Sequence, residues 1–537
     1  VSRGRTEVIC GQGPAPAKAT IAHYRSLGLD MVPGTGLLAA CVPGTFDAYM
    51  LLLRDYGTMR LRDVLEAAIF YAREGYPLVS RIPDTIATVE NMFRERWTSS
   101  AAIYLPGGRV PETGDLFTNP VLADTYQRIL AEAESGGGGR EAEIERARRV
   151  WSRGFVAEAI AEFCRSQEVM DTSGTPHRGV LDGDDLARFE ASVEAPIGYD
   201  YGRYRVLKCG PWTQGLATLQ QLALLKGFDL DGLDPAGPGF IHLAVECAKL
   251  AFADRDTFYG DPDFVDVPIE ALLSDGYNAE RRALVGREAS LDLRPGIVPG
   301  YGKAIGARVG GARTAVGASG AGEPTVGRIG SPRSEKALEK IGAVRGDTVH
   351  FDIIDRAGNM ISGTPSGGWL HSSPVIPKLG FPLGTRAQMF WLDEEHPAAL
   401  APGKRPRSTL SPTMALRDGE PYLAWGSPGG DQQDQWIPQF FLRHVHADMN
   451  LQESIDCPAF HTEHFPSSFW PRTSRPGVVV VEGRMPEATI EELRRLGHEV
   501  EVGDDWSEGR LTAASRDGVR RKAAANPRGM QGYAAGR

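Results

Sequence analysis

The spacing of apolar residues predicts a mainly helical first part of the chain. Apolar side chains recur there every three or four positions, the period that gives a helix one buried face. Helices are expected within residues 14–75, 118–133, 140–166, 214–225 and 241–253. The first is expected to begin at Pro16, because proline fits the first turn of a helix, and a strand-like stretch begins at Val206.

The pattern changes to strand alternation in the last third of the chain. Apolar and polar residues alternate over 348–355 and resume at Met360 after a turn, which predicts a hairpin. A second hairpin is expected within 413–425, followed by a helix over 433–449. We therefore expect a strand-rich second part.

A segment of unusual composition separates the two parts. Residues 300–330 are rich in Gly, Ala, Ser and Arg and contain almost no large apolar side chain, so they cannot bury a core. We expect a mobile surface linker over 300–347, between a first part of 1–347 and a second part of 348–537. An exposed joint of this kind is suited to being cut.

The composition limits the classes of partner. The chain of 537 residues has a formal net charge of −10 and scattered basic residues, which does not suit nucleic-acid binding. No apolar run approaches the roughly 18 to 20 residues of a membrane span, and the given sequence does not open with a signal peptide. We expect a cytoplasmic protein that binds neither nucleic acid nor a membrane. A periplasmic or secreted protein stays open if the amino terminus of the given sequence is incomplete.

The candidate for chemistry is Gly346-Asp347-Thr348, at the start of the first predicted strand of the second part. A threonine hydroxyl is a poor nucleophile without a neighbouring base. Cleavage of the Asp347–Thr348 bond would give Thr348 a free α-amino group, whose pKa of about 8 lets it accept the hydroxyl proton. The same hydroxyl could make the cut by attacking the preceding carbonyl. The alternative is that Thr348 only begins a strand, where threonine is common.

Several motifs, in the right order over essentially the whole chain, resemble the γ-glutamyltransferase family of N-terminal-nucleophile hydrolases. The matching segments are 15–19, 250–255 with 260–263, 348–359, 404–413, 426–430 and 526–532. One such segment would be weak evidence for the family, and the resemblance rests on the whole set in its order along the chain. It implies an α+β fold, a four-layer αββα sandwich in which two antiparallel sheets are enclosed by helices.

The resemblance also implies roles for individual residues. Thr348 corresponds to the nucleophile that becomes the amino terminus of a small subunit after self-cleavage, and 1–347 to the large subunit of the resulting heterodimer, with a higher oligomer left open. Gly429 and Gly430 correspond to the oxyanion hole, where glycines allow a close backbone approach; a plain tight turn is the alternative. Ser366 falls where the family carries a second threonine that supports the nucleophile.

The positions that bind a γ-glutamyl group in the family are altered here. Gln12 stands at the place of the carboxylate-binding arginine, Gly368 at that of an asparagine, and Trp391 at that of the aspartate that pairs with the ammonium. Glutamine cannot supply a charge-assisted bidentate clamp. Three polar residues of the family's pocket are retained in this sequence: Gln388, Ser408 and Thr409. They are either pocket residues here or ordinary polar residues under a loop.

These losses together predict a substrate other than a glutamyl amide. We expect hydrolysis of a small-molecule amide through an acyl-threonine, with a smaller or more apolar acyl group and with Trp391 lining the pocket; transfer to an amine stays open. Amidases for oxamate-like compounds and cephalosporin-type acylases belong to the wider family, and the chain looks nearer to them. The alternative is a non-catalytic or unprocessed member that keeps the fold as a binding scaffold.

No cofactor or metal is expected. His444 with His446 and His461 with His464 invite a metal hypothesis, but neither an HExxH motif nor a carboxylate-rich ligand set accompanies them. Nucleotide-binding loops and a GxSxG elbow are also missing from the sequence.

The resemblance raises one question about the amino terminus. Family members normally begin with some tens of residues that carry a strand and a long central helix before the segment seen here. The given sequence starts beyond them at Val1. We therefore expect that the given sequence is a fragment, that its gene start is misplaced, or that the chain lacks part of the core.

Overall fold

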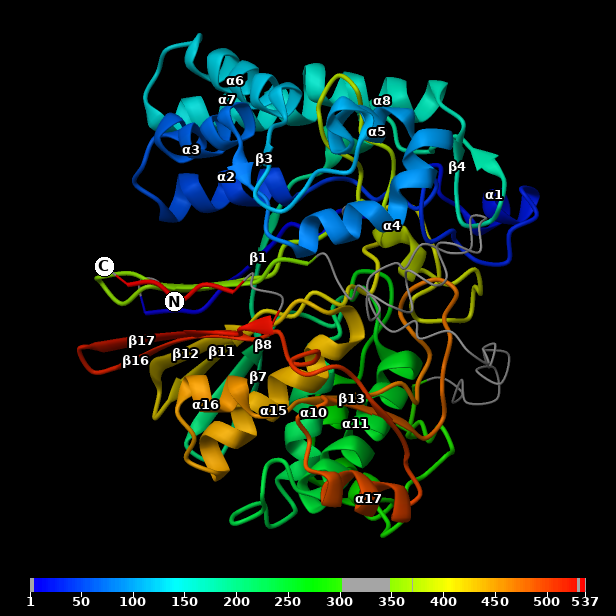
Figure 1. The fold of residues 1–537 in the computed structure, drawn as a ribbon, viewed down its shortest axis with the longest axis vertical. Coiled ribbons are helices and arrows are strands. Elements are labelled where there is room, and N and C mark those ends of the chain that lie inside the picture. The colour runs from blue at the N-terminus through cyan, green and yellow to red at the C-terminus, as the bar shows by residue number, and fades with distance from the viewer. Residues whose placement is uncertain (1–3, 302–347, 369, 529–531, 537) are drawn as a thin grey trace.

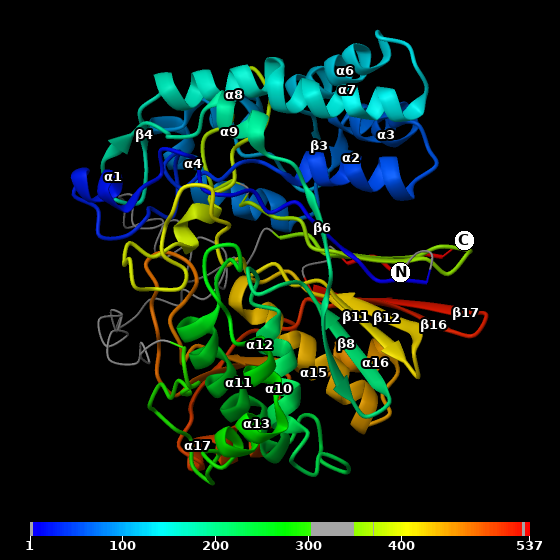
Figure 2. The same cartoon turned by 180° about the vertical axis from the view of Figure 1, so that it is seen from behind.

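The computed structural model describes residues 4–301, 348–368, 370–528 and 532–536. Nearly all of the expected linker, and Asp347 with it, lies outside these residues. The described chain forms a helical region above a region built on a sheet in Figure 1, which Figure 2 shows from behind. Helices and mostly antiparallel strands occur together, so the expected α+β class is confirmed.

The helical region is built from the first part of the chain. Its helices are α1 (Ile21–Ser26), α2 (Thr45–Tyr56), α3 (Leu61–Glu74), α4 (Arg81–Glu95), α5 (Thr98–Tyr104), α6 (Pro120–Glu134), α7 (Arg140–Arg153), α8 (Phe155–Ser166) and α9 (Gly183–Arg188). Their apolar faces form one core, which also takes in Leu370, Ile376 and Leu379 from the second part. The two parts of the chain are therefore interleaved in space.

The main sheet has six strands in the order β17-β16-β12-β11-β8-β7. Their bounds are β7 (Ile197–Tyr201), β8 (Tyr204–Lys208), β11 (Thr413–Arg417), β12 (Glu420–Gly426), β16 (Thr512–Asp517) and β17 (Arg520–Ala525). Strand β8 pairs antiparallel with β11, with Leu207 opposite Met414. The expectation of a helical first part and a strand-rich second part was too simple, because the first part supplies two strands of this sheet.

Helices cover one face of the main sheet. They are α10 (Leu216–Leu225), α11 (Pro238–Phe258), α15 (Gln433–His446) and α16 (Leu451–Asp456), with α12 (Ile269–Leu273), α13 (Asp275–Arg282) and α17 (Glu487–Arg495) in the same region, as Figures 1 and 2 together show. Every residue of α10 is buried, because the helix lies between the sheet and the outer helices. The core of this region packs Trp425 of β12 against Trp436 and Phe441 of α15.

The opposite face of the main sheet carries the hairpin of β9 (Phe351–Ile354) and β10 (Met360–Gly363), which contacts β12 and β16. This is the first hairpin expected from the sequence. Shorter strands complete the described chain. Three two-stranded sheets pair β1 (Val8–Cys10) with β6 (Ser192–Glu194), β2 (Tyr76–Pro77) with β3 (Leu116–Phe117), and β4 (Val169–Met170) with β5 (Pro176–His177), and a small sheet contains β13 (Phe460–Thr462), β14 (Val478–Val481) and β15 (Glu499–Val502). The four-layer sandwich stays a prediction.

Expected and observed helix boundaries differ at several places. The first helix begins at Ile21 and not at Pro16, because the Thr20 hydroxyl caps it by accepting from the backbone N–H of His23. The run over 140–166 breaks at Gly154, where the backbone is extended. The helix expected to reach residue 449 ends at His446.

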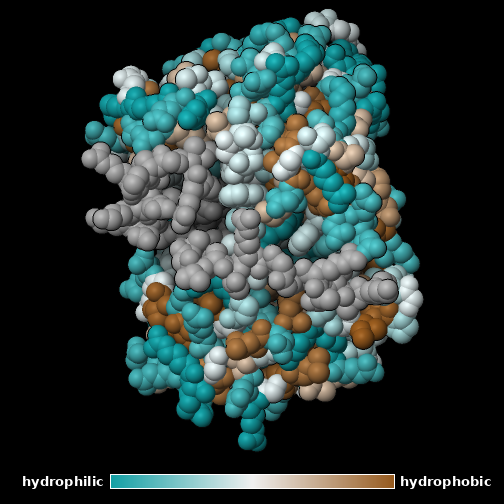
Figure 3. All heavy atoms as spheres, turned by 90° about the vertical axis from the view of Figure 1, so that its right-hand side faces the viewer, coloured by the Kyte–Doolittle hydropathy of each residue, from teal (hydrophilic) through white to brown (hydrophobic). Residues whose placement is uncertain are grey.

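Among the residues placed by the structure, no helix combines enough length with enough apolar character to span a bilayer. On the face shown in Figure 3, apolar residues lie in separate small patches among polar ones.

Buried histidines link α11 to the outer loops. His242 and His498 share a hydrogen bond of 2.9 Å between ring nitrogens. His464 accepts from the backbone N–H of Gly477 at 3.1 Å, and its other ring nitrogen lies 3.1 Å from the carbonyl of Asp292. Burial, reinforced by the nearby Lys249 charge, lowers the pKa of His464 to about 4 and that of His498 to about 3.

These depressed values predict a loss of stability in acid. An unfolded histidine binds a proton below a pKa of about 6.5, whereas folded His464 does so only near pH 4. The free energy of unfolding should therefore keep its full value above pH 6.5 and decrease as the pH drops from 6.5 towards 4. Thermal melting midpoints measured across this range should fall less steeply for His464→Gln than for the wild type. Parallel curves for the two proteins would contradict this assignment.

Candidate active site

The start of the second part lies against the segment that follows β10. The Thr348 hydroxyl donates to the Ser366 hydroxyl across 3.1 Å, and the backbone N–H of Val349 donates to the carbonyl of Pro365 at 3.2 Å. Thr348 is buried, with an exposed fraction of 7%. The structure thus brings together the two hydroxyl residues that the sequence nominated as nucleophile and support.

His350 fixes the direction of the strand that starts at Thr348. One ring nitrogen lies 2.8 Å from the Thr364 hydroxyl and the other 3.0 Å from a carboxylate oxygen of Asp352. The imidazole packs directly on Gly426, where an added Cβ would come within 2.3 Å of the ring. Because Gly426 ends β12 just before the Gly429–Gly430 turn, this contact holds the start of the second part near that turn.

The Gly429–Gly430 turn requires glycine. Both residues have positive φ, +128° at Gly429 and +57° at Gly430, a region that side-chain-bearing residues rarely adopt. A Cβ on Gly429 would also meet the Trp436 ring at 2.7 Å. The segment is therefore a tight turn, and this conformation is also compatible with the oxyanion-hole role expected from the sequence.

A buried polar network holds this turn from below. The side-chain amide of Gln214 donates to the carbonyl of Gly430 at 3.0 Å, and Arg255 donates to Gln214 at 3.0 Å and to Asp431 at 2.5 Å. Ser468 donates to Asp431 through its backbone N–H and its hydroxyl. Burial opposes ionisation of Asp431, but the Arg255 charge and the Ser468 hydrogen bonds outweigh it and lower the pKa of this carboxyl.

These supporting residues were not identified as functional from the sequence. Arg255 belonged to a matching motif, but no role was assigned to it or to Gln214. A signal was present: Asp254, Arg255 and Asp256 are three consecutive charged residues near the end of a mainly apolar helix, and all are buried. Buried charges require partners, and those partners are far away along the chain.

A cavity of about 360 Å³ opens beside Ser366. Such a volume is within the usual range for a small-molecule site. Gln12, Gly368 and Arg386 also line it. Gly368 has a φ of +91°, and a Cβ there would meet that of Ser372 at 2.8 Å, so the site could not carry the family's asparagine without rearrangement. The cavity thus joins Ser366 to two of the positions at which the chain departs from the family.

The remaining nominated residues do not line this cavity. The Gln388 side chain donates to the carbonyl of Gly34 and to the Thr385 hydroxyl, and accepts from the backbone N–H of Trp470. Trp391 stacks on His396 with ring centroids 4.5 Å apart. Ser408 and Thr409 are fully buried, and the Ser408 backbone bridges to residues 212–214. Their proposed binding roles stay predictions.

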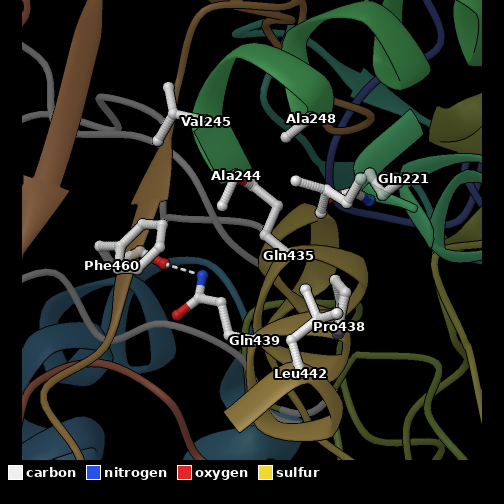
Figure 4. Close-up of a pocket in the computed structure, with 10 residues that line it drawn as sticks. Gln221, Ala244, Val245, Ala248, Gln435, Pro438, Gln439, Leu442 and Phe460 are labelled. Carbon is white, nitrogen blue, oxygen red and sulfur yellow. Dashed lines mark hydrogen bonds between the residues drawn. The ribbon is translucent and has the colours of Figure 1, made fainter. Parts of the chain in front are cut away.

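A second enclosed space lies in the core and does not suit a substrate. It has a volume of about 10 Å³ between α10, α11, α15 and β13. Figure 4 shows Gln439 donating to the carbonyl of Phe460 at its edge, a bond of 2.7 Å. A space this small holds a water molecule at most.

The histidines that suggested a metal have protein partners. His444 lies 2.7 Å from the Tyr422 hydroxyl, and His446 lies 2.7 Å from the Tyr201 hydroxyl. His461 lies 2.8 Å from Glu508. Within the described ranges, no group of three or more His, Cys, Asp or Glu side chains is arranged to hold a metal ion.

Comparisons with known proteins find similarity along essentially the whole chain. A family model described as gamma-glutamyltranspeptidase matches residues 1–536. The oxamate amidohydrolase proenzyme of Klebsiella pneumoniae is 28% identical, over 93% of this chain and 81% of its own length. A solved structure named LmbA2991HD is 51% identical, with a TM-score of 0.87, covering all of this chain and 88% of that one. The cephalosporin acylase of Bacillus halodurans is 26% identical, with a TM-score of 0.78, covering all of this chain and 85% of that one.

The support of the glycine turn generates a first kinetic prediction. Gln214→Met keeps the side-chain length but removes the donor to Gly430, so the turn should lose its fixed orientation. If the turn forms the predicted oxyanion hole, the kcat of amide hydrolysis should fall about tenfold or more and KM should change less than about threefold, since such a hole binds the transition state better than the substrate.

The matched control for this prediction is Gln221→Met. Gln221 is an equally buried glutamine of α10 that donates to the carbonyls of Ala217 and Asp434, away from the turn. Its replacement should lower the melting temperature without the loss of kcat. Equal kcat values for the two variants would show that Gln214 has only a structural role.

Proposed function

Because this chain belongs to the gamma-glutamyltranspeptidase family, we propose that it is a self-cleaving amide hydrolase whose nucleophile is Thr348. The observation that carries the proposal is the hydrogen bond of 3.1 Å between the Thr348 and Ser366 hydroxyls, beside the cavity. It orients the attacking oxygen in the way expected of a supported hydroxyl nucleophile. The four-layer αββα sandwich is part of this proposal.

Self-cleavage would proceed by attack of the Thr348 hydroxyl on the carbonyl of Asp347. The peptide nitrogen of Thr348 leaves as an amine, and water hydrolyses the resulting ester, which frees the Asp347 carboxyl group. The products are a large subunit of 1–347 and a small subunit of 348–537. Pairing of β8 with β11 supports a heterodimer that holds together after the cut, because the main sheet draws strands from both subunits.

The mature enzyme would use Thr348 as nucleophile and base together. Its α-amino group accepts the hydroxyl proton, and the oxygen attacks the amide carbon of the substrate. Backbone N–H groups of Gly429 and Gly430 stabilise the developing oxyanion. The amine product leaves with the transferred proton, and water then releases the acyl group from Thr348.

The substrate that we propose carries an acyl group other than γ-glutamyl. Gln12 lines the cavity where the family has an arginine, and Gly368 provides no side chain there. Relatives named oxamate amidohydrolase and cephalosporin acylase support this direction, since their names describe amides of other acids.

Thr348→Ala tests the nucleophile. The variant lacks the hydroxyl, so it should remain a single chain on a denaturing gel and lose amide hydrolysis by about a thousandfold or more. Wild-type protein should give two bands, and Edman sequencing of the smaller should begin at Thr348. Thr348→Ser, which keeps a hydroxyl, is the matched control and should still cut itself.

The result also distinguishes a self-cleaving hydrolase from a non-catalytic member of the family. Wild-type material that is folded but uncut and inactive would favour a non-catalytic scaffold. A Thr348→Ala protein with full turnover would remove Thr348 from the reaction altogether.

Acyl specificity gives a further prediction. γ-Glutamyl-p-nitroanilide should be hydrolysed about a hundredfold less efficiently than a p-nitroanilide whose acyl group has no ammonium, because the paired contacts for a glutamyl group are missing and such contacts are worth about 2–5 kcal/mol. Comparison of kcat/KM for the two on the processed protein checks this. Efficient turnover of the glutamyl compound would refute the altered specificity and leave the nucleophile assignment intact.

A further inference from the structure

Lys208 is a buried cation at the joint between the two parts of the chain. It is the last residue of β8, and its side chain is fully buried. Its ammonium lies 3.2 Å from a carboxylate oxygen of Asp434, which is equally buried. A charge removed from water needs a partner of opposite sign, and this partner comes from the second part of the chain. The pair therefore adds a side-chain link to the backbone pairing of β8 with β11.

Asp434 connects Lys208 to the glycine turn. It lies in the first turn of α15, shortly after Gly430. One of its carboxylate oxygens also accepts from the hydroxyls of Thr218 and Ser411, each at 2.6 Å. The other oxygen is buried and has no hydrogen-bond partner in the described part of the chain. Because the two hydroxyls carry no charge, Lys208 supplies the compensating charge that holds this carboxylate, and with it the start of the helix.

The same ammonium connects to the hairpin that follows Thr348. It donates to the Thr413 hydroxyl at 2.7 Å and to the carbonyl of Ser411 at 3.0 Å. The backbone N–H of Thr413 in turn donates to the hydroxyl of Ser362, in β10, at 3.3 Å. Lys208 thus links the two halves of the candidate site, with the hairpin on one side and the glycine turn on the other.

Gly215 leaves room for the Lys208 side chain. It precedes α10 with an ordinary helical backbone, so its own conformation does not require glycine. An added Cβ, however, would lie 2.8 Å from Cε of Lys208 and 3.2 Å from its Cβ. A methyl group at this position would therefore displace the lysine side chain without removing a charge.

We propose that Lys208 is a positioning residue, which holds the glycine turn in a fixed place relative to the hairpin that follows Thr348. It acts through Asp434 and Thr413. An oxyanion hole stabilises the transition state only if its N–H groups point to where the charge develops, so a small displacement of the turn should slow the chemical step. The inference rests on the proposed function for the reaction, whereas the order of the turn can be measured without a substrate.

The first test removes both charges of the pair together. Loss of one alone would leave a buried charge without compensation, so the variant is Lys208→Met with Asp434→Asn, in which asparagine can still accept from the two hydroxyls. The substrate is butyryl-p-nitroanilide, whose acyl group has neither a carboxylate nor an ammonium. We expect kcat per folded molecule to fall about tenfold or more and KM to change less than about threefold. An unchanged kcat, or a loss confined to KM, would overturn the proposal.

The matched control removes another buried lysine–carboxylate pair. Lys249 and Glu246 lie 2.7 Å apart within α11 and are as deeply buried as Lys208 and Asp434. Lys249→Met with Glu246→Gln should lower the melting temperature but leave kcat within about twofold of the wild-type value. An equal fall in kcat for both double variants would contradict a positioning role. Gln221→Met leaves the charges and the hydroxyl contacts of Asp434 in place, so it should still keep its kcat.

A second variant keeps both charges of the pair. Gly215→Ala presses on the Lys208 side chain, so we expect kcat to fall about threefold or more. Gly239→Ala is its control, because an added Cβ there meets only Leu233, whose Cδ2 lies at the ordinary distance of 3.8 Å. Its kcat should equal that of the wild type. A wild-type kcat in Gly215→Ala would refute the proposal even if the first double variant failed to fold.

Hydrogen exchange separates this proposal from the hydrolase proposal. Exchange of the backbone N–H groups of 427–435, measured by mass spectrometry, reports the order of the turn without any substrate. We expect it to be about tenfold faster in the first double variant than in the wild type, and unchanged in the control pair. If the wild type is inactive but exchange depends on Lys208, only the hydrolase proposal fails. If the wild type is active and neither kcat nor exchange depends on Lys208, only the positioning role fails.

Discussion

The antiparallel pairing of β8 with β11 is the interaction on which the rest of the structure depends. Strand β8 belongs to the first part of the chain and β11 to the second, and their pairing makes one six-stranded sheet out of both. One face of that sheet is covered by helices from both parts, and the other carries the hairpin that follows Thr348. Non-local backbone hydrogen bonds therefore set the position of Thr348, and the proposed cut in the connecting segment would leave these bonds untouched.

A buried ion pair supports the glycine turn. Arg255 and Asp431 form this pair beneath the turn, and such pairs contribute little net stability because desolvation offsets their attraction. Their value lies in geometry: each satisfies several hydrogen bonds and so restricts the turn to one conformation.

The departures from the family form a coherent set when seen in space. Gln12 and Gly368 are far apart along the chain but line one cavity. A lost arginine alone would weaken the binding of an acidic substrate, and a lost ammonium partner alone would weaken the binding of an amino acid. Two of the three altered positions therefore bear on the same cavity, which supports the proposed change of acyl group.

The sequence by itself determined the family, both hairpins of the second part and the glycine turn, and it nominated Thr348 and Ser366 together, because these depend on local alternation, on glycine conformation and on ordered motifs. It also indicated that positions 12, 368 and 391 lack the arginine, asparagine and aspartate with which the family binds a γ-glutamyl group. Only the tertiary structure decided that the first part supplies two strands of the main sheet, that Gln214 and Arg255 hold the turn, and that Arg386 reaches the cavity while Gln388 and Trp391 do not line it. The physical reason is that strand partners, buried charge partners and cavity walls are formed between residues distant along the chain, and periodicity carries no information about such contacts.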